Sequence, residues 1–229
     1  MQNTFNGFPK ETFQFFSDLS KNNNKQWFEA SRSIYDEYVK NTAVSFVTSM
    51  GEQLQTIVPG IHAIPKIDKS IFRIHRDTRF SKNKDPYKTQ LAFLFWDGTA
   101  RKMENPGFYM HLTPETFFAG VGMHKFPKDV FPKYRDAVVH KVLGRKLTDA
   151  IEKVTKNPDY KTGWKKYKRI PAGYDADHPN AELLLYGGMG FEYEEPLPKI
   201  VHEDGFVEYA FKIFKDMSPI HFWLREMLG

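Results

Sequence analysis

The longest uninterrupted apolar stretch of the sequence is the six-residue run Leu91–Trp96, and it constrains the fold more than any other feature. A segment that is apolar on both faces is typical of a strand at the centre of a sheet. Six residues are too few for a helix to cross a bilayer. The first seven residues have no basic segment followed by an apolar run. We therefore expect neither a membrane span nor a signal peptide.

The N-terminal quarter, residues 9–58, has a helical period. Apolar residues at Phe13, Phe16 and Leu19 predict a short amphipathic helix, and the asparagines that follow predict a junction. A second, longer helix is expected up to Pro59 and Gly60. Its inward-facing residues are predicted to be Trp27, Ile34, Tyr38, Phe46, Met50, Leu54 and Ile57.

From Ile71 the period changes to two, which predicts a strand with Phe72 and Ile74 on its core side. Arg76 then falls on the apolar side. Because an unpaired buried cation is costly, we expect Arg76 to pair with a carboxylate such as Asp77, or the strand to bulge.

The segments Gly107–Leu112 and Thr116–Met123 predict a hairpin that turns at Pro114 and Glu115. In this register, Phe108, Met110 and Leu112 share an apolar face with Phe117, Ala119 and Val121. Tyr109, His111 and three glycines lie on the opposite face, with His111 across from Phe118. Strand glycines indicate close packing over bare backbone or, less often, the approach of a ligand.

Helical spacing returns after Pro127, and two helices separated at Ser218 and Pro219 are predicted for residues 203–228. Phe211, Phe214, Trp223 and Leu224 are predicted to point inward. Helices on both sides of a mostly antiparallel sheet make the predicted class α+β. No linker or repeat divides the sequence, so we expect one domain over residues 1–229, helical over about 9–58 and mixed over about 66–229.

The net charge of the whole chain is +5. Residues 66–90 contain eight Lys or Arg and three Asp, so this segment carries the entire excess and the rest is neutral. A local patch of cations predicts an anionic partner. The absence of cysteine excludes disulfides and thiol nucleophiles and fits a reducing compartment, so a cytoplasmic protein is expected.

The sequence resembles the family called domain of unknown function 2461. The resemblance rests on the pattern RDxRFSKxKxPYKT at residues 76–89, on Gly107, Phe108 and Tyr109, and on Arg135. Further matching positions are the N-terminal Phe16, Leu19, Asn22, Asn23, Trp27 and Phe28, then Gly120 and Gly122, Pro171-Ala172-Gly173-Tyr174, and His178-Pro179. The resemblance implies no particular activity.

The first hypothesis for function is a basic cleft that binds a phosphorylated or carboxylated small molecule, with or without catalysis. Arginine binds such groups bidentately and lysine supplies a mobile point charge. Imidazoles titrate near neutral pH, so His111 and His75 are candidate general acids or bases, with Asp77 as an orienting group. The predicted ligand-binding residues are Arg76, Arg79, Lys82, Lys84, Tyr87, Lys88, Tyr109 and Gly120.

Two alternatives stay open. Nucleic acid would be bound by the patch and by the second basic segment, residues 161–169, with Trp164, Tyr167, Phe80 or Tyr87 stacking on bases. In the second alternative, the protein is an interaction module whose basic patch binds acidic segments of a partner protein. No Walker loop, nucleophile elbow or His-Glu-x-x-His helix is present. The sequence predicts no metal site, because Asp175, Asp177 and His178 suit turn capping better. It assigns no cofactor and does not decide whether the protein is an enzyme.

Overall fold

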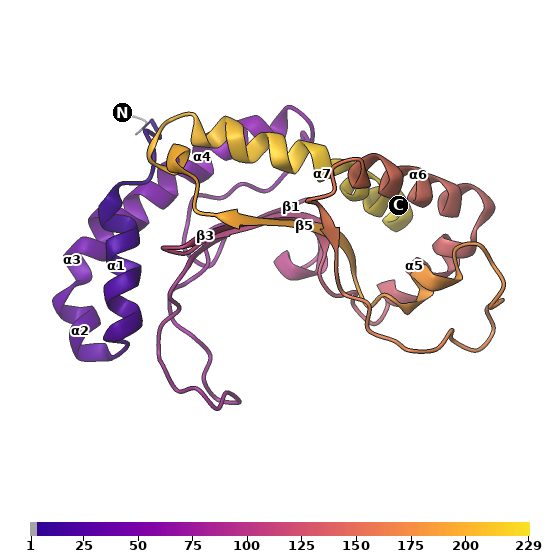
Figure 1. Cartoon of the computed structure of the whole chain (residues 1–229), viewed down its shortest axis with the longest axis horizontal. Helices are drawn as coiled ribbons and strands as arrows, with labels where there is room; N and C mark the ends of the chain where they lie inside the picture. Colours follow the sequence, from indigo (N-terminus) through magenta and orange to yellow (C-terminus); the bar gives the residue numbers. More distant parts are fainter. Residues whose placement is uncertain (1–3) are drawn as a thin grey trace. The chain divides into compact units, whose positions relative to one another are not determined.

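The computed structural model describes residues 4–229 and shows a five-stranded antiparallel sheet with helices before and after it in the chain (Figure 1). The predicted α+β class is confirmed. The helical elements before the sheet are α1 (Lys10–Lys21), α2 (Lys25–Ala30), α3 (Arg32–Ile34), a π-helix (Tyr35–Lys40) and α4 (Asn41–Gln55). The later helices are α5 (Val130–Val139), α6 (Lys141–Thr155) and α7 (Phe206–Leu228).

The strands are β1 (Leu91–Trp96), β2 (Gly107–Leu112), β3 (Thr116–Met123), β4 (Lys161–Thr162) and β5 (Met189–Pro196). Their order in the sheet is β1-β2-β3-β5-β4. All six residues of β1 are buried, as predicted for a strand that is apolar on both faces. Its predicted place at the centre of the sheet is wrong, because β1 is an end strand of this order. An isolated antiparallel bridge pairs its Phe93 with Ile71. Short 3-10 helices occupy Lys102–Glu104, Ala181–Leu185 and Lys199–His202.

Contacts group the chain into two compact units. Unit one contains the chain up to Phe95, Tyr109–Ala119 and Glu194–Lys212, and unit two contains Trp96–Phe108, Gly120–Tyr193 and Ile213–Gly229. The prediction of one domain over the whole chain stays a prediction. The core of unit one is aromatic, with the ring of Phe8 5.3 Å from Phe46 and 6.2 Å from Phe93.

The predicted hairpin of β2 and β3 is confirmed. The amide of Thr113 donates to the carbonyl of Thr116 at 3.0 Å, which closes the turn in the predicted register. The rings of His111 and Phe118 stack 4.8 Å apart, as expected for opposed residues. Gly122 has φ +140 and an added Cβ would lie 2.2 Å from the carbonyl oxygen of Met189. Close packing of backbone therefore explains this glycine.

The N-terminal helices have the predicted period, but the phase of the second is wrong in its first half. Phe28, Tyr35 and Val39 are buried there, whereas Ile34 is 42% exposed. In this half, the predicted residues Trp27, Ile34 and Tyr38 are each followed directly by an apolar residue. The spacing therefore predicts a helix but does not decide which of the two adjacent positions faces the core. The single long helix predicted here is also interrupted, at Ser31 and by the π-helix.

The break predicted at Ser218 and Pro219 is wrong, because α7 continues through Pro219. Proline has no N–H, so the carbonyl of Lys215 loses its usual helical donor. The hydroxyl of Ser218 donates to that carbonyl at 2.7 Å and replaces the missing bond. The predicted inward residues of this segment, Phe211, Phe214, Trp223 and Leu224, are all buried.

Replacing Ser218 by alanine is expected to lower the free energy of unfolding by about 1–2 kcal/mol, because the Lys215 carbonyl, in a partly buried hydrogen bond, loses its donor. Urea unfolding measures the change. Ser20 is the control, since its hydroxyl donates to the Ser17 carbonyl at 2.7 Å in an exposed hydrogen bond of α1. If Ser218→Ala is no less stable than the control Ser20→Ala, the hydroxyl of Ser218 does not compensate for the missing N–H of Pro219.

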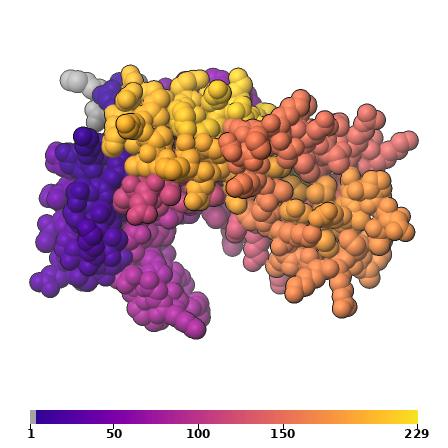
Figure 2. All heavy atoms as spheres, in the orientation of Figure 1, coloured from indigo at the N-terminus to yellow at the C-terminus, as the bar shows by residue number. Residues whose placement is uncertain are grey.

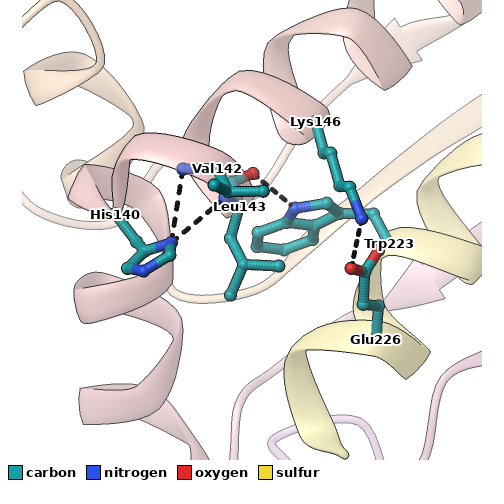
Figure 3. Close-up of polar contacts among 6 residues, drawn as sticks. All are labelled: His140, Val142, Leu143, Lys146, Trp223 and Glu226. Carbon is teal, nitrogen blue, oxygen red and sulfur yellow. Dashed lines mark hydrogen bonds and ion pairs between the residues drawn. The ribbon is translucent and has the colours of Figure 1, made fainter.

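Within unit two, α6 is joined to α7 by the contacts drawn in Figure 3. The indole Nε1 of Trp223 donates to the carbonyl of Leu143 at 2.8 Å, and Lys146 pairs with Glu226. His140 caps α6, since its Nδ1 accepts from the amides of Val142 and Leu143. These bonds fix the start of α6 against the end of α7.

Candidate functional site

A stem of paired backbone carries the basic loop, which we define as residues 73–88. The amide of Arg76 donates to the carbonyl of Pro86, and the amide of Lys88 donates to the carbonyl of Ile74, both at 2.8 Å. His75 and Tyr87 form an isolated antiparallel bridge between them. The loop, purple to magenta in Figure 1, extends away from the strands. The continuous strand predicted from Ile71 does not form. Isolated bridges at Ile71 and His75 are present in its place.

Asn23 attaches this stem to the junction of α1 and α2. Its side-chain amide donates to the carbonyl of Tyr87 and its Oδ1 accepts from the amide of Tyr87, both at 3.0 Å. Tyr87 is 4% exposed and its ring stacks on Phe28, with the centroids 4.3 Å apart. In Figure 2 the loop accordingly lies against the indigo N-terminal helices. The helix cap of α2 is the next residue, Asn24, which accepts from the amide of Trp27.

Arg76 has no carboxylate partner among the described residues, contrary to expectation. Its guanidinium donates to the backbone carbonyl of Asp85 at 3.1 Å and to the hydroxyl of Ser81 at 3.5 Å. Asp77 pairs with Arg79 instead, through two bonds of 2.9 and 2.7 Å. This hydrogen bonding from Arg79 lowers the pKa of Asp77 to about 2. Three of the five N–H groups of Arg76 are not used by these bonds.

A pocket of about 560 Å³ opens at the base of the basic loop. All of its lining residues lie in unit one. Four of them, Arg76, Asp77, Tyr87 and Lys88, were predicted as site residues from the sequence. The others are Asn23, Asn83, Asp85, Thr89 and Gln90. The pocket therefore combines two cations, two carboxylates and several neutral hydrogen-bonding side chains.

Lys88 lies in an environment that disfavours its charge. Burial lowers the pKa of its ammonium, and the nearby Arg73 lowers it further, whereas Asp68 opposes both effects. The ammonium donates to the carbonyl of Arg73 at 3.0 Å, which uses one of its three N–H groups. It also lies 5.3 Å from the ring centroid of Phe72. An anion in the pocket would stabilise the charged form that these neighbours disfavour.

The remaining cations predicted for the site do not line this pocket. Arg79 pairs with Asp77 on the surface. Lys84 donates to the carbonyl of Thr78 at 3.0 Å, and Lys82 is exposed. Several of the loop's cations thus bind its own backbone and carboxylates. From the sequence alone, cations that stabilise the loop cannot be distinguished from cations that bind a ligand.

Tyr109 and His111 lie on the face of β2 that was predicted, with their rings 5.7 Å apart, and neither lines the pocket. The side-chain amide of Gln90, a lining residue, donates to the hydroxyl of Tyr109 at 3.5 Å. Burial raises the pKa of Tyr109 to about 12. Burial also lowers the pKa of His111, and the charge of Glu194 opposes this effect. His111 Nδ1 is buried and has no hydrogen-bond partner within residues 4–229.

The other predicted residues are placed elsewhere. His75 is exposed and its ring lies 5.1 Å from that of Tyr87. Gly120 is buried in β3, at the start of a segment of unit two. Asp175 and His178 accept from backbone amides of nearby turn residues, as expected for capping. Within residues 4–229, no three His, Asp or Glu side chains gather closely enough to hold a metal ion.

Three of the four aromatic residues proposed to stack on bases are engaged in packing. Tyr87 stacks on Phe28, Tyr167 stacks on Phe131, and the indole of Trp164 covers the bare backbone of Gly190. Trp164 reaches that position with a φ of +71, in the left-handed region. Phe80, at the tip of the basic loop, is 96% exposed.

A family model of a conserved hypothetical protein matches residues 11–223 of the chain. The chain belongs to the DUF2461 family. The match spans both units and includes the basic loop, Asn23 and Arg135, so the resemblance expected from the sequence is confirmed. No curated protein matches this DUF2461 chain. None of the helices described for it is both long and apolar enough to cross a membrane.

Proposed function

We propose that this DUF2461 protein binds a small phosphorylated or carboxylated molecule in the pocket at the base of the basic loop. The observation that carries the proposal is the pair of cations in the pocket lining, Arg76 and Lys88. Arg76 is held in place by bonds to the loop and keeps N–H groups for a ligand. Lys88 is partly buried beside Arg73, so an anion would relieve an unfavourable arrangement of charge.

The carboxylates in the lining restrict what this pocket accepts. Asp77 is already bound to Arg79, which offsets its charge. Asp85 repels an anion at one side, so the ligand is expected to present hydroxyl or amide donors there and its anionic group toward Arg76 and Lys88. Gln90 and Tyr109 extend this polar surface toward His111. If the protein is an enzyme, His111 is the proposed acid or base, and Asp77 and His75 are weaker candidates.

Replacing Arg76 by glutamine is expected to weaken binding of citrate or inorganic phosphate about tenfold or more, because a charged hydrogen-bond donor is lost from the pocket. Isothermal titration calorimetry measures the affinity, and circular dichroism verifies the fold. Lys82→Gln is the matched control, since Lys82 is exposed and does not line the pocket. Equal losses in the two variants would contradict a pocket centred on Arg76.

Native mass spectrometry of the protein purified at low salt can identify a natural ligand. A discrete adduct of small mass supports the pocket. The nucleic-acid alternative rests on Phe80, whose exposed ring has the guanidinium of Arg79 5.8 Å from its centroid. Oligonucleotide binding that falls by orders of magnitude between low and physiological salt would favour that alternative.

A further inference from the structure

A guanidinium in unit two packs against a pair of stacked aromatic rings, Phe131 and Tyr167, whose centroids lie 5.4 Å apart. The Cζ atom of Arg135 lies 4.1 Å from the ring centroid of Phe131 and 5.2 Å from that of Tyr167. The two rings are nearly parallel, with an interplanar angle of 19°. Phe131 and Arg135 are one turn apart on α5, and Tyr167 comes from the second basic segment. These cation–π contacts hold the guanidinium beside the ring pair without using its N–H groups in hydrogen bonds to a carboxylate.

The hydrogen-bonding capacity of Arg135 is not met by the protein. Its Nε is buried without a hydrogen-bond partner among residues 4–229, and no ion pair between described residues includes it. The adjacent carboxylate, Asp136, accepts instead from the hydroxyl of Tyr174 at 2.7 Å. A buried charged donor without an acceptor is costly, which points to an acceptor that the chain itself does not provide.

A second cation lies near the same tyrosine ring. The Nζ atom of Lys166 lies 5.5 Å from the ring centroid of Tyr167. Its aliphatic stem packs on Gly187, where an added Cβ would lie 2.8 Å from Cδ of Lys166. Lys166 also has no ion pair among the described residues. Two cations are therefore positioned around one tyrosine ring by packing.

The second basic segment, which supplies Tyr167 and Lys166, carries only positive charges. Residues 161–169 contain five Lys or Arg and no acid. Among the described residues, Lys165 of this segment forms an ion pair with Glu182 at 2.9 Å. Such a segment attracts anions toward the cluster.

We propose that Arg135 and Lys166 form a second oxyanion site, which binds a small carboxylate or a phosphate group. The guanidinium edge supplies paired donors for two oxygens of the ligand, and the ammonium supplies a point charge. The site lies in unit two and uses no residue of the basic loop. Its ligand is separate from the one proposed for the pocket of unit one.

The test follows the Nε–H signal of Arg135 by ¹H–¹⁵N NMR while sodium phosphate or sodium acetate is added at constant ionic strength. A saturable shift with either anion, absent with chloride, is the expected result. Tighter binding of phosphate assigns the site to phosphoryl groups, and equal or tighter binding of acetate assigns it to carboxylates. The variant Lys166→Gln keeps the stem on Gly187 and should weaken binding about tenfold.

Two controls separate this site from other effects. Arg145→Gln removes an exposed cation of α6 and should leave the titration of Arg135 unchanged. Arg76→Gln should also leave it unchanged, so failure of the unit-one pocket and failure of this site are distinguishable. No saturable shift with phosphate and acetate, or an identical shift in Lys166→Gln, would overturn the proposal and leave Arg135 as a structural clamp between α5 and residues 161–169.

Discussion

Tyr87→Ala is expected to lower the free energy of unfolding by about 3–5 kcal/mol, which is typical of removing a buried aromatic side chain. Tyr87 is 4% exposed, and its ring lies 4.3 Å from that of Phe28 in a stacked arrangement. The loss of this ring removes the main apolar contact between the stem of the basic loop and the N-terminal helices. Chemical denaturation measures the change in stability.

Tyr87→Phe is the matched control. It keeps the ring on Phe28 and removes only the hydroxyl, which has no hydrogen-bond partner within residues 4–229. The change in the free energy of unfolding should therefore be less than about 1 kcal/mol. Anion binding should follow the same order, with loss in the alanine variant and retention in the phenylalanine variant. If Tyr87→Ala is as stable as Tyr87→Phe, the stem is held by hydrogen bonds and not by the stacked ring.

Acidification from pH 6.5 toward pH 4 is expected to destabilise the fold through His221. Burial lowers the pKa of His221 to about 4, an effect that Asp97 opposes and Arg225 increases. The folded state therefore binds this proton more weakly than the unfolded chain does. The stability due to His221 is complete above pH 6.5 and is lost as the pH falls through this window, by roughly 3 kcal/mol in total.

The measurement compares the pH dependence of unfolding in the unmodified chain and in His221→Gln, which cannot take up this proton. Other groups titrate in both proteins, so the difference between the two curves isolates His221. The His221 ring is fully buried, 4.7 Å from Phe108, and its Nε2 lies 3.3 Å from Asp97. Parallel curves between pH 7.5 and 4 would show that the histidine does not titrate in this way.

Periodicity and apolar runs were sufficient to predict much of the fold. Leu91–Trp96 was predicted as a buried strand, and the hairpin register followed from alternation alone. The failures have physical causes. A proline usually ends a helix, but the hydroxyl of Ser218 keeps α7 continuous by a contact that the sequence does not specify. β5 alternates apolar Met189, Phe191 and Tyr193 with other residues, but its glycine and three glutamates are disfavoured in strands, and it was not predicted.

The candidate site was predicted as a segment but not as an arrangement. Arg76 and Lys88 line the pocket, whereas Arg79 and Lys84 bind groups of the loop itself, and their side chains have the same chemistry in the sequence. Asn23 was interpreted only as part of a helix junction. Its bonds to Tyr87 could not be foreseen, because the two residues are 64 positions apart in the sequence. Arg135 was noted only as part of the family pattern, because its stacking on Tyr167 depends on a loop whose path has no periodic signal.

The two bonds between Asn23 and Tyr87 also determine when the pocket can exist. They join positions 64 residues apart, so their formation closes a long loop of chain and is expected late in folding. Release of the Asn23 bonds together with the stacked ring of Tyr87 would free the stem while the sheet remains folded, as a local opening. The exchange rate of the Tyr87 amide hydrogen with solvent therefore reports how often the assembled pocket opens.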